Sequence, residues 1–191
     1  MPTLSILVPS LNERANLATL VAWVRPVLDA EDGELVVVDD GSTDGSLDEL
    51  TRLSSTEPRL VVRRHDRRRG IPQAWSTALT TARGVWVASL DADLQYEPGD
   101  VQRLLAHARS RGVDFVQGAR QRIESEGALR HALSRGLNAA LNVTFGTTAL
   151  DHKSALFVCR HEHLARLLTQ RHHFRHWQCF IGVSARALGL S

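Results

Sequence analysis

The sequence predicts an α/β fold in which a mostly parallel central sheet is flanked by helices. Short apolar runs with strand character recur at residues 4–8, 35–38, 60–62 and 85–90. Stretches with helical spacing lie between these runs, and strands that alternate with helices pair in parallel. In addition, polar segments follow three of the four runs. These patterns indicate an α/β domain with a ligand site beyond the carboxyl ends of its strands.

The first strand and the helix after it have the clearest patterns. Residues 4–8 are apolar except for Ser5 and are followed by Pro9, which ends the strand. Asn12 and Glu13 then open an amphipathic helix. Its apolar side chains recur every three or four residues, at Leu17, Leu20, Val21, Val24 and Leu28. This spacing places them on one face of the helix, which can pack against the sheet.

The next elements repeat the same alternation. The second strand is expected at 35–38, with a helix near 46–53. The third strand is expected at 60–62, with a helix near 72–82. The apolar run at 85–90 is the fourth strand, and it leads into the segment Asp91–Ala92–Asp93.

Polar side chains follow three of the four expected strands. They lie at Asn12–Glu13, at Asp39–Asp40 and at Asp91–Ala92–Asp93. Because the carboxyl ends of parallel strands meet at one edge of a sheet, ligands of open α/β sheets bind there. The shared placement of the three segments therefore predicts a binding site better than any one of them would alone.

The segment after the fourth strand has the composition of a divalent-metal site. Asp91, Asp93 and Gln95 alternate along the chain, so in an extended segment their oxygens would point the same way. Hard oxygen ligands without His or Cys suit Mg²⁺ or Mn²⁺, which usually keep waters and bind substrate phosphates. The plainer interpretation is an acidic loop that caps the next helix.

Composition narrows the class of protein. A chain of 191 residues can bury a sizeable core, and its formal net charge of +2 does not demand a nucleic-acid partner. Lys153 is the only lysine, so arginine carries nearly all the positive charge, which we interpret as the mark of a GC-rich bacterial genome. Cys159 and Cys179 have no metal or redox spacing, which fits a reducing cytoplasm. We find no signal peptide and no apolar run of about 20 residues that could span a bilayer.

Several motifs, in this order, resemble those of family 2 glycosyltransferases, most closely the dolichyl- or polyprenyl-phosphate mannose synthase branch. The resemblance extends from Leu4 to about Arg160. The matching segments are 8–13, 37–45, Arg69–Gly70 with Ala74, 91–95 with Pro98, 118–120, Arg130 with Ser134, and 151–157.

The resemblance implies a GT-A, Rossmann-like nucleotide-sugar-binding fold. We expect residues 1–191 to form a single domain that lacks the C-terminal extension usual in this branch. Leu11 stands where the family usually has an aromatic residue near the base, which removes a stacking surface. Ala155–Leu156 replaces the usual small glycine, so the acceptor side is expected to differ.

The resemblance also assigns residues to a nucleotide-sugar donor. Those that match the nucleotide pocket of the family, or lie close to it, are Pro9, Glu13, Val38, Asp40 and Arg69. Asp91 is expected to contact substrate as well as metal, and Asp93 to act in catalysis. The arginine-rich segment 63–69 could equally be a solvated surface, and the resemblance favours a partial role for Arg69 alone.

On the acceptor side, Arg120, Arg130 and Ser134 have the chemistry to orient a lipid phosphate. A lipid monophosphate is already anionic at neutral pH and needs no base. Asp151 is the candidate base if the acceptor is instead a hydroxyl. Residues 128–143 have helical spacing, which is typical either of a helix packed on the sheet or of an interfacial helix at a membrane surface.

The expected activity is inverting, metal-assisted transfer of a hexose, mannose or glucose, from GDP- or UDP-hexose to a polyprenyl phosphate. The expected location is the cytoplasm, with peripheral contact at the cytoplasmic face of the membrane. Two alternatives stay open. The same fold could transfer sugar to a hydroxyl of a saccharide or natural product, or the chain could be a non-catalytic nucleotide-binding module.

Overall fold

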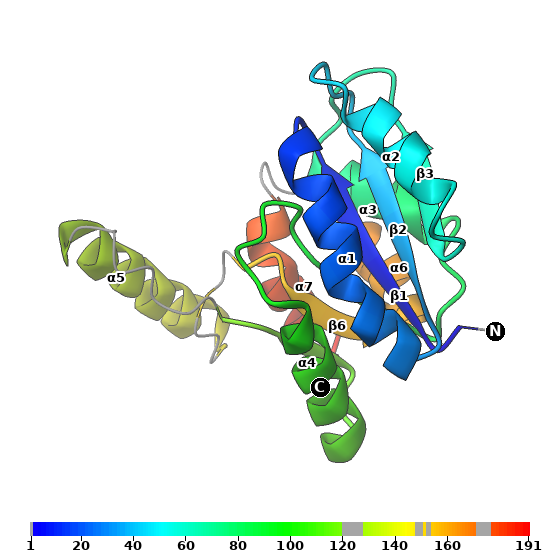
Figure 1. The fold of residues 1–191 in the computed structure, drawn as a ribbon. Coiled ribbons are helices and arrows are strands. Elements are labelled where there is room, and N and C mark those ends of the chain that lie inside the picture. Colours follow the sequence, from blue (N-terminus) through cyan, green and yellow to red (C-terminus); the bar gives the residue numbers. More distant parts are fainter. Residues whose placement is uncertain (1, 120–127, 148–150, 152–153, 171–176) are drawn as a thin grey trace.

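The computed structural model describes residues 2–119, 128–147, 151, 154–170 and 177–191, with the backbone alone for 128–135 and 137. Its centre is a six-stranded sheet of order β3-β2-β1-β4-β6-β5 (Figure 1). The strands are β1 (Leu4–Ser10), β2 (Gly33–Asp39), β3 (Leu60–Arg64), β4 (Trp86–Ser89), β5 (Phe115–Gln117) and β6 (Phe157–Arg160).

The first four strands are parallel, as the alternation of strands and helices predicts. Strands β5 and β6 form an antiparallel extension, in which β6 runs antiparallel to both β4 and β5. The chain therefore runs outward from β1 to β3 and then returns to place β4 on the other side of β1. A crevice at such a reversal is where open α/β sheets bind ligands.

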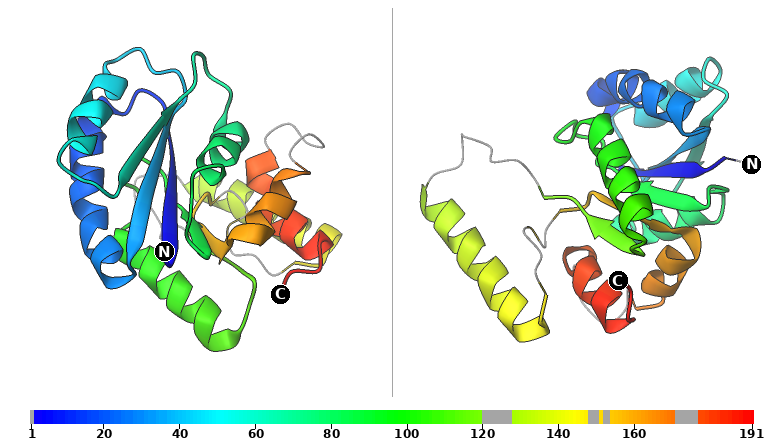
Figure 2. Two further views of the ribbon diagram at one scale, coloured as in Figure 1. Left: turned by 90° about the vertical axis from the view of Figure 1, so that its right-hand side faces the viewer. Right: turned by 90° about the horizontal axis from the view of Figure 1, so that it is seen from below.

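The helices are α1 (Arg14–Ala30), α2 (Ser46–Ser54), α3 (Ile71–Leu79), α4 (Pro98–Arg111), α5 (Ala128–Phe145), α6 (His161–Leu168), the 3₁₀ helix η1 (Trp177–Phe180) and α7 (Ile181–Ala187). Helices other than α5 cover both faces of the sheet: α1, α2 and α4 lie on one face and α3, α6 and α7 on the other (Figure 2). The buried side chains form two clusters, one under each of these groups.

Alternation along the strands explains the two clusters. In β1, Ile6 and Val8 belong to the cluster under α1, whereas Leu7 belongs to the cluster under α3. The five apolar positions expected on the first helix are all buried in α1. The fold class and the parallel pairing of the first four strands are therefore confirmed.

Helix α5 stands apart from the sheet and from the other helices in Figures 1 and 2. Near its C-terminal end the Val143 side chain is 87% exposed and Phe145 is 39% exposed. The sequence allowed either a helix packed on the sheet or an interfacial helix. In the structure, the backbone of α5 does not pack on the sheet (Figures 1 and 2). No helix in the described part of the chain combines the length and the apolarity needed to cross a bilayer.

Candidate active site

The loops after β1 and β2 are joined by hydrogen bonds between one loop's backbone and the other's side chains. The Asn12 N–H donates to Ser42 Oγ at 2.8 Å, and Asn12 Oδ1 accepts from the Thr43 N–H at 2.9 Å. The Glu13 N–H donates to Ser46 Oγ at 3.1 Å. Asn12 has a positive φ of 57°, which turns the chain sharply between strand and helix. These bonds fix the position of Glu13 at the carboxyl edge of the sheet.

Asp40 ties the β2 loop to the loop between β3 and α3. Its Oδ1 accepts from the Arg69 N–H at 2.8 Å and its Oδ2 accepts from the Gly70 N–H at 2.7 Å. Oδ1 also lies 2.6 Å from Nδ1 of His65, which is buried. The Asp40 carboxylate is therefore held from three directions, and its residue is only 4% exposed.

The loop after β4 turns where an extended chain was expected. Leu94 has a φ of 62°, and the Gln95 N–H donates to Asp93 Oδ1 at 3.2 Å. This is the geometry of an Asx turn, in which an aspartate oxygen accepts from a backbone amide two residues later. The alternate spacing of Asp91, Asp93 and Gln95 therefore does not align their side chains as it would in a strand.

These loops enclose a cavity of about 320 Å³ at the carboxyl ends of β1, β2 and β4. Five of the residues assigned to substrate or metal meet there, and the full lining is Pro9, Ser10, Leu11, Glu13, Asp40, Arg68, Gly70, Ile71, Asp91, Ala92 and Asp93. We call this space the donor cavity, after the nucleotide-sugar donor that the sequence resemblance leads us to expect. It brings together residues separated by up to about 80 positions in the chain, as the shared strand-end placement predicts.

Other predicted residues lie elsewhere. The Val38 side chain is completely buried in the cluster under α3. Arg69 and Gln95 do not line the cavity, although the Arg69 amide holds Asp40. Arg120 lies outside the described residues, and the structure describes only the backbone of Arg130 and Ser134, which lie in α5.

The structure also adds two residues that the sequence analysis did not single out. Arg68 lines the donor cavity in place of its neighbour Arg69. The arginine-rich segment was the available signal, but a row of similar side chains does not reveal which one faces inward. Ser10 also lines the cavity, and its buried Oγ has no hydrogen-bond partner in the described part of the chain. Such an atom is a ready contact for a polar ligand.

The donor set of the cavity fits a hard divalent ion. Asp91 and Asp93 supply carboxylates at one wall. Among the described residues, no three His, Cys, Asp or Glu side chains gather closely enough to hold a metal without help. Magnesium is commonly bound by one or two carboxylates together with substrate phosphates, so the pair suits an ion that arrives with a phosphorylated ligand.

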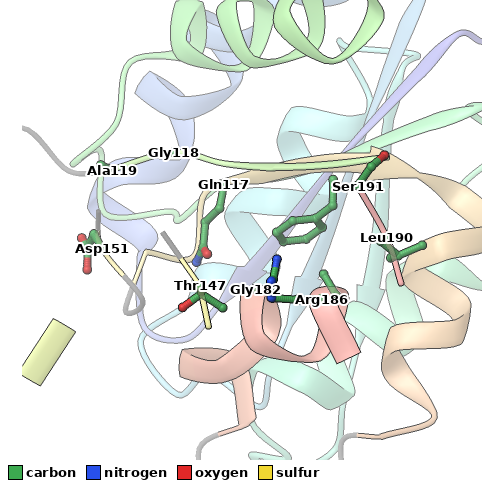
Figure 3. Close-up of a pocket in the computed structure, with 11 residues that line it drawn as sticks. Gln117, Gly118, Ala119, Thr147, Asp151, Gly182, Arg186, Leu190 and Ser191 are labelled. Carbon is green, nitrogen blue, oxygen red and sulfur yellow. The ribbon is translucent and has the colours of Figure 1, made fainter. Parts of the chain in front are cut away.

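Asp151 lines a different cavity, of about 460 Å³, between β5 and α7 (Figure 3). Gln117 enters this space from β5 and Arg186 from α7, and Thr147 lies at its side. No residue that the structure describes lines both cavities. The structure therefore does not bring Asp151 together with Asp91 and Asp93.

Comparison with known proteins gives a consistent result. The model of the family described as glycosyl transferase family 2 matches residues 5–182. An undecaprenyl-phosphate 4-deoxy-4-formamido-L-arabinose transferase of Aeromonas hydrophila is 31% identical over 78% of this chain and 46% of its own length. A dolichol-phosphate mannosyltransferase of Pyrococcus furiosus is 32% identical over 69% of this chain and 38% of its own. The chain thus spans less than half of either relative.

Solved structures agree on the fold. Glucosyl-3-phosphoglycerate synthase from Mycobacterium tuberculosis, in complex with Mn²⁺, UDP and glucosyl-3-phosphoglycerate, matches with a TM-score of 0.66 and 25% identity. The match covers 85% of this chain and 58% of that one. A mannosyltransferase from Pyrobaculum calidifontis in complex with GDP-Man and Mn²⁺ matches with a TM-score of 0.61 and 24% identity, over 87% and 46% of the two chains.

Proposed function

The chain belongs to glycosyltransferase family 2 and has the GT-A fold, and we propose that it transfers a hexose from a nucleoside-diphosphate sugar to a polyprenyl phosphate with inversion at the anomeric carbon. The sugar is mannose or glucose, carried by GDP or UDP. The observation that carries this proposal is the donor cavity, where Asp40, Glu13, Arg68, Asp91 and Asp93 meet at the carboxyl edge of the parallel strands.

The distribution of charge in the cavity suits the two halves of the donor. Glu13 and Asp40 are acceptors for N–H and O–H groups of a base or ribose, and they would repel phosphate. Arg68 offers a guanidinium that can pair with phosphate oxygens. Pro9, Leu11 and Ile71 add apolar surface to the same lining. We therefore assign the nucleoside to the side of Asp40 and the diphosphate to the side of Arg68.

Asp91 and Asp93 are the proposed ligands of Mg²⁺ or Mn²⁺, and Gln95 is the proposed third. When bound, such an ion neutralises the charge that develops on the departing diphosphate. Gln95 is exposed beside the turn at Leu94, outside the cavity lining. It would have to turn inward to join the two carboxylates, so we place more weight on Asp91 and Asp93.

A lipid phosphate is the proposed acceptor. The names of two curated relatives contain undecaprenyl phosphate and dolichol phosphate. These names support a polyprenyl phosphate as the acceptor of this chain. Arg120, Arg130 and Ser134 are the proposed phosphate contacts. Helix α5 stands clear of the sheet and carries Arg130, so peripheral contact with the cytoplasmic face of a membrane is part of this proposal.

A second candidate function is transfer to a hydroxyl acceptor that is not a lipid. Two observations favour it: Asp151 lines a cavity of its own, and the matching structure from Mycobacterium tuberculosis contains glucosyl-3-phosphoglycerate. In that case Asp151 would accept the proton of the attacking hydroxyl. A non-catalytic nucleotide-binding role is the third possibility. A wild-type chain that binds UDP or GDP but transfers sugar to no acceptor would identify it.

A transfer assay separates these functions. The chain is incubated with radiolabelled GDP-mannose or UDP-glucose, Mn²⁺ and a polyprenyl phosphate, and the product is extracted into organic solvent. Label in the organic phase supports the lipid acceptor. Label in a water-soluble product, formed with a saccharide or with phosphoglycerate, would overturn the lipid assignment in favour of the second function.

The metal assignment is tested on Asp93→Asn. We expect this variant to keep its melting temperature, because Asp93 is exposed, and to lose the Mn²⁺-dependent part of UDP or GDP binding measured by calorimetry. Asp66→Asn is the matched control. Its side chain is 91% exposed in the loop after β3 and does not line the cavity. Equal Mn²⁺ dependence in Asp93→Asn and wild type would contradict the assignment.

A further inference from the structure

A buried histidine lies directly behind the wall of the donor cavity. His65 follows β3 and is 5% exposed. Its Nδ1 lies 2.6 Å from Asp40 Oδ1, and its Nε2 lies 2.8 Å from Oγ1 of Thr77, a residue of α3. Neither His65 nor Thr77 lines the cavity, whereas Asp40 does. The His65 ring thus connects Asp40, which lines the cavity, to Thr77 of helix α3.

The hydrogen-bond donors and acceptors in the contacts from Asp40 through His65 to Thr77 can be assigned by starting at the Asp40 carboxylate. An ionised carboxylate only accepts hydrogen bonds, so Nδ1 of His65 carries a proton and donates it to Asp40. In the neutral ring Nε2 is then an acceptor, and the Thr77 hydroxyl can donate to it. Both ring nitrogens are satisfied in this arrangement, which defines one tautomer and one ring orientation.

The arrangement leaves the two oxygens of Asp40 unequal. Within the part of the chain that the structure describes, Oδ1 accepts from the His65 ring and from the Arg69 amide, whereas Oδ2 accepts from the Gly70 amide alone. A carboxylate oxygen offers about two acceptor positions. Oδ2 therefore keeps one position for a ligand, and the histidine is the side chain that fixes which oxygen this is.

We propose that His65, supported by Thr77, is a positioning residue of the donor site. It orients the Asp40 carboxylate so that Oδ2 can accept an N–H or O–H group of the nucleoside. The inference rests on the proposed function, since it concerns how a nucleoside-diphosphate donor is recognised. It adds to that function two residues which do not touch the ligand.

The surrounding backbone indicates that the ring is not needed merely to hold the loop. The His65 N–H already donates to the Asp39 carbonyl at 2.8 Å, and the Arg69 and Gly70 amides already reach Asp40. An apolar side chain of similar size would fill the same buried space without polar atoms that must be satisfied. What the imidazole adds is a hydrogen bond to one chosen oxygen of Asp40.

The test compares nucleotide affinity with stability in four variants. UDP and GDP are titrated by calorimetry with Mn²⁺ and with EDTA, and melting temperatures are measured alongside. His65→Leu removes both ring contacts, Thr77→Val removes the support alone, and His65→Asn keeps an N–H in the Nδ1 position. Ser184→Ala is the control, because it removes the buried Trp177 Nε1 to Ser184 Oγ hydrogen bond of 2.9 Å away from the cavity.

We expect His65→Leu to weaken binding about tenfold or more, since a hydrogen bond to a charged group is lost. Thr77→Val should weaken it severalfold, and His65→Asn should recover most of the wild-type affinity. The losses should persist in EDTA, because they concern the nucleoside. Ser184→Ala should lower the melting temperature and leave affinity unchanged.

Two outcomes are decisive against the proposal and can be told apart. If the wild type binds UDP or GDP and His65→Leu binds it equally, the positioning role is overturned and the donor site stands. If the wild type binds neither nucleotide, the proposed function itself falls, and this inference falls with it. Should His65→Leu not fold, unchanged affinity in Thr77→Val overturns the role of the pair.

Discussion

At the scale of single residues, Gly41 allows the loop that carries Arg68 to pack closely against the loop after β2. It has a φ of +82°, and a Cβ built on it would lie 2.7 Å from the Arg67 carbonyl carbon and 2.8 Å from the Arg68 nitrogen. The backbone before Arg68 can approach β2 only because Gly41 has no side chain. A larger residue would displace the loop that carries Arg68 into the cavity.

We predict that Gly41→Ala lowers the free energy of unfolding by about 1–3 kcal/mol, the cost of a strained backbone, and weakens binding of UDP or GDP. Denaturant unfolding and calorimetry measure the two effects. Gly112→Ala is a matched control, because Gly112 also has a positive φ of +65° but no atom within 4 Å of its would-be Cβ. It should lose stability and keep its affinity. Unchanged binding in Gly41→Ala would show that the loop does not contact the nucleotide.

At the scale of elements, α5 is the part whose role depends most on the acceptor. Arg130→Ala should reduce turnover with a polyprenyl phosphate about ten- to a hundredfold, the effect of losing one charge-assisted contact. Donor binding should stay constant, because the described residues that line the donor cavity all lie between Pro9 and Asp93. Arg130→Lys should recover part of the loss, since lysine keeps the charge without the planar two-point contact. An equal loss with a neutral sugar acceptor would contradict a phosphate contact.

The elements that the sequence predicts best are those with long, regular patterns. Helix α1 has its five expected apolar positions buried, and β1 to β4 pair in parallel as expected. Boundaries differ by a few residues: the third helix was expected at 72–82 and ends at Leu79. Hydrophobic spacing identifies an element through its buried face, and it says little about the residue at which the element ends.

No comparable pattern predicts β5 and β6, which have three and four residues. Segments so short contain too few alternations to define a face. The donor cavity was foreseen as a cluster of strand ends, whereas the turn at Leu94 and the place of Arg68 in the lining were not. Both depend on backbone dihedral angles in loops, which residue spacing does not encode.

At the scale of the whole molecule, a cluster of charges around Glu57 joins distant parts of the fold. Glu57, 4% exposed, pairs with Arg25 of α1 and with Arg59 just before β3, each at 2.9 Å. The Arg59 guanidinium, followed by that of Arg25, holds the Glu57 pKa below its ordinary value of 4.5. This carboxylate is therefore more stable as an anion in the folded chain than in the unfolded one.

The pKa shift sets the direction of a pH effect. A carboxyl whose pKa is lowered by folding stabilises the fold above pH 4.5, and this contribution is lost as the pH falls through the folded-state pKa. We predict that Glu57→Gln melts at a lower temperature than the wild type at pH 7, and that the difference shrinks toward pH 3. Thermal melts across this range measure it.

The control for this experiment is Glu49→Gln. Glu49 also pairs with an arginine, Arg52, but the arginine side chain is 61% exposed and the pair lies on the surface of α2. Arg52 also lowers the Glu49 pKa, but exposed ion pairs contribute little to stability. Glu49→Gln should therefore change the melting temperature in the same direction as Glu57→Gln and by less. A constant difference for Glu57→Gln from pH 7 to pH 3 would show that packing, and not charge, is what the substitution removes.

The strand order has a consequence for the sequence of events as the chain leaves the ribosome. Strands β1, β2 and β3 are neighbours in both chain and sheet, so they can pair as soon as about the first 80 residues have emerged. Strand β4 must then return to the opposite side of β1, bringing Asp91 and Asp93 to a wall that Glu13 and Asp40 already form. If translation is stalled once the chain has emerged to just past α3, the nascent chain should already form the part of the cavity proposed for the nucleoside. The proposed metal ligands Asp91 and Asp93 have not yet emerged at that point.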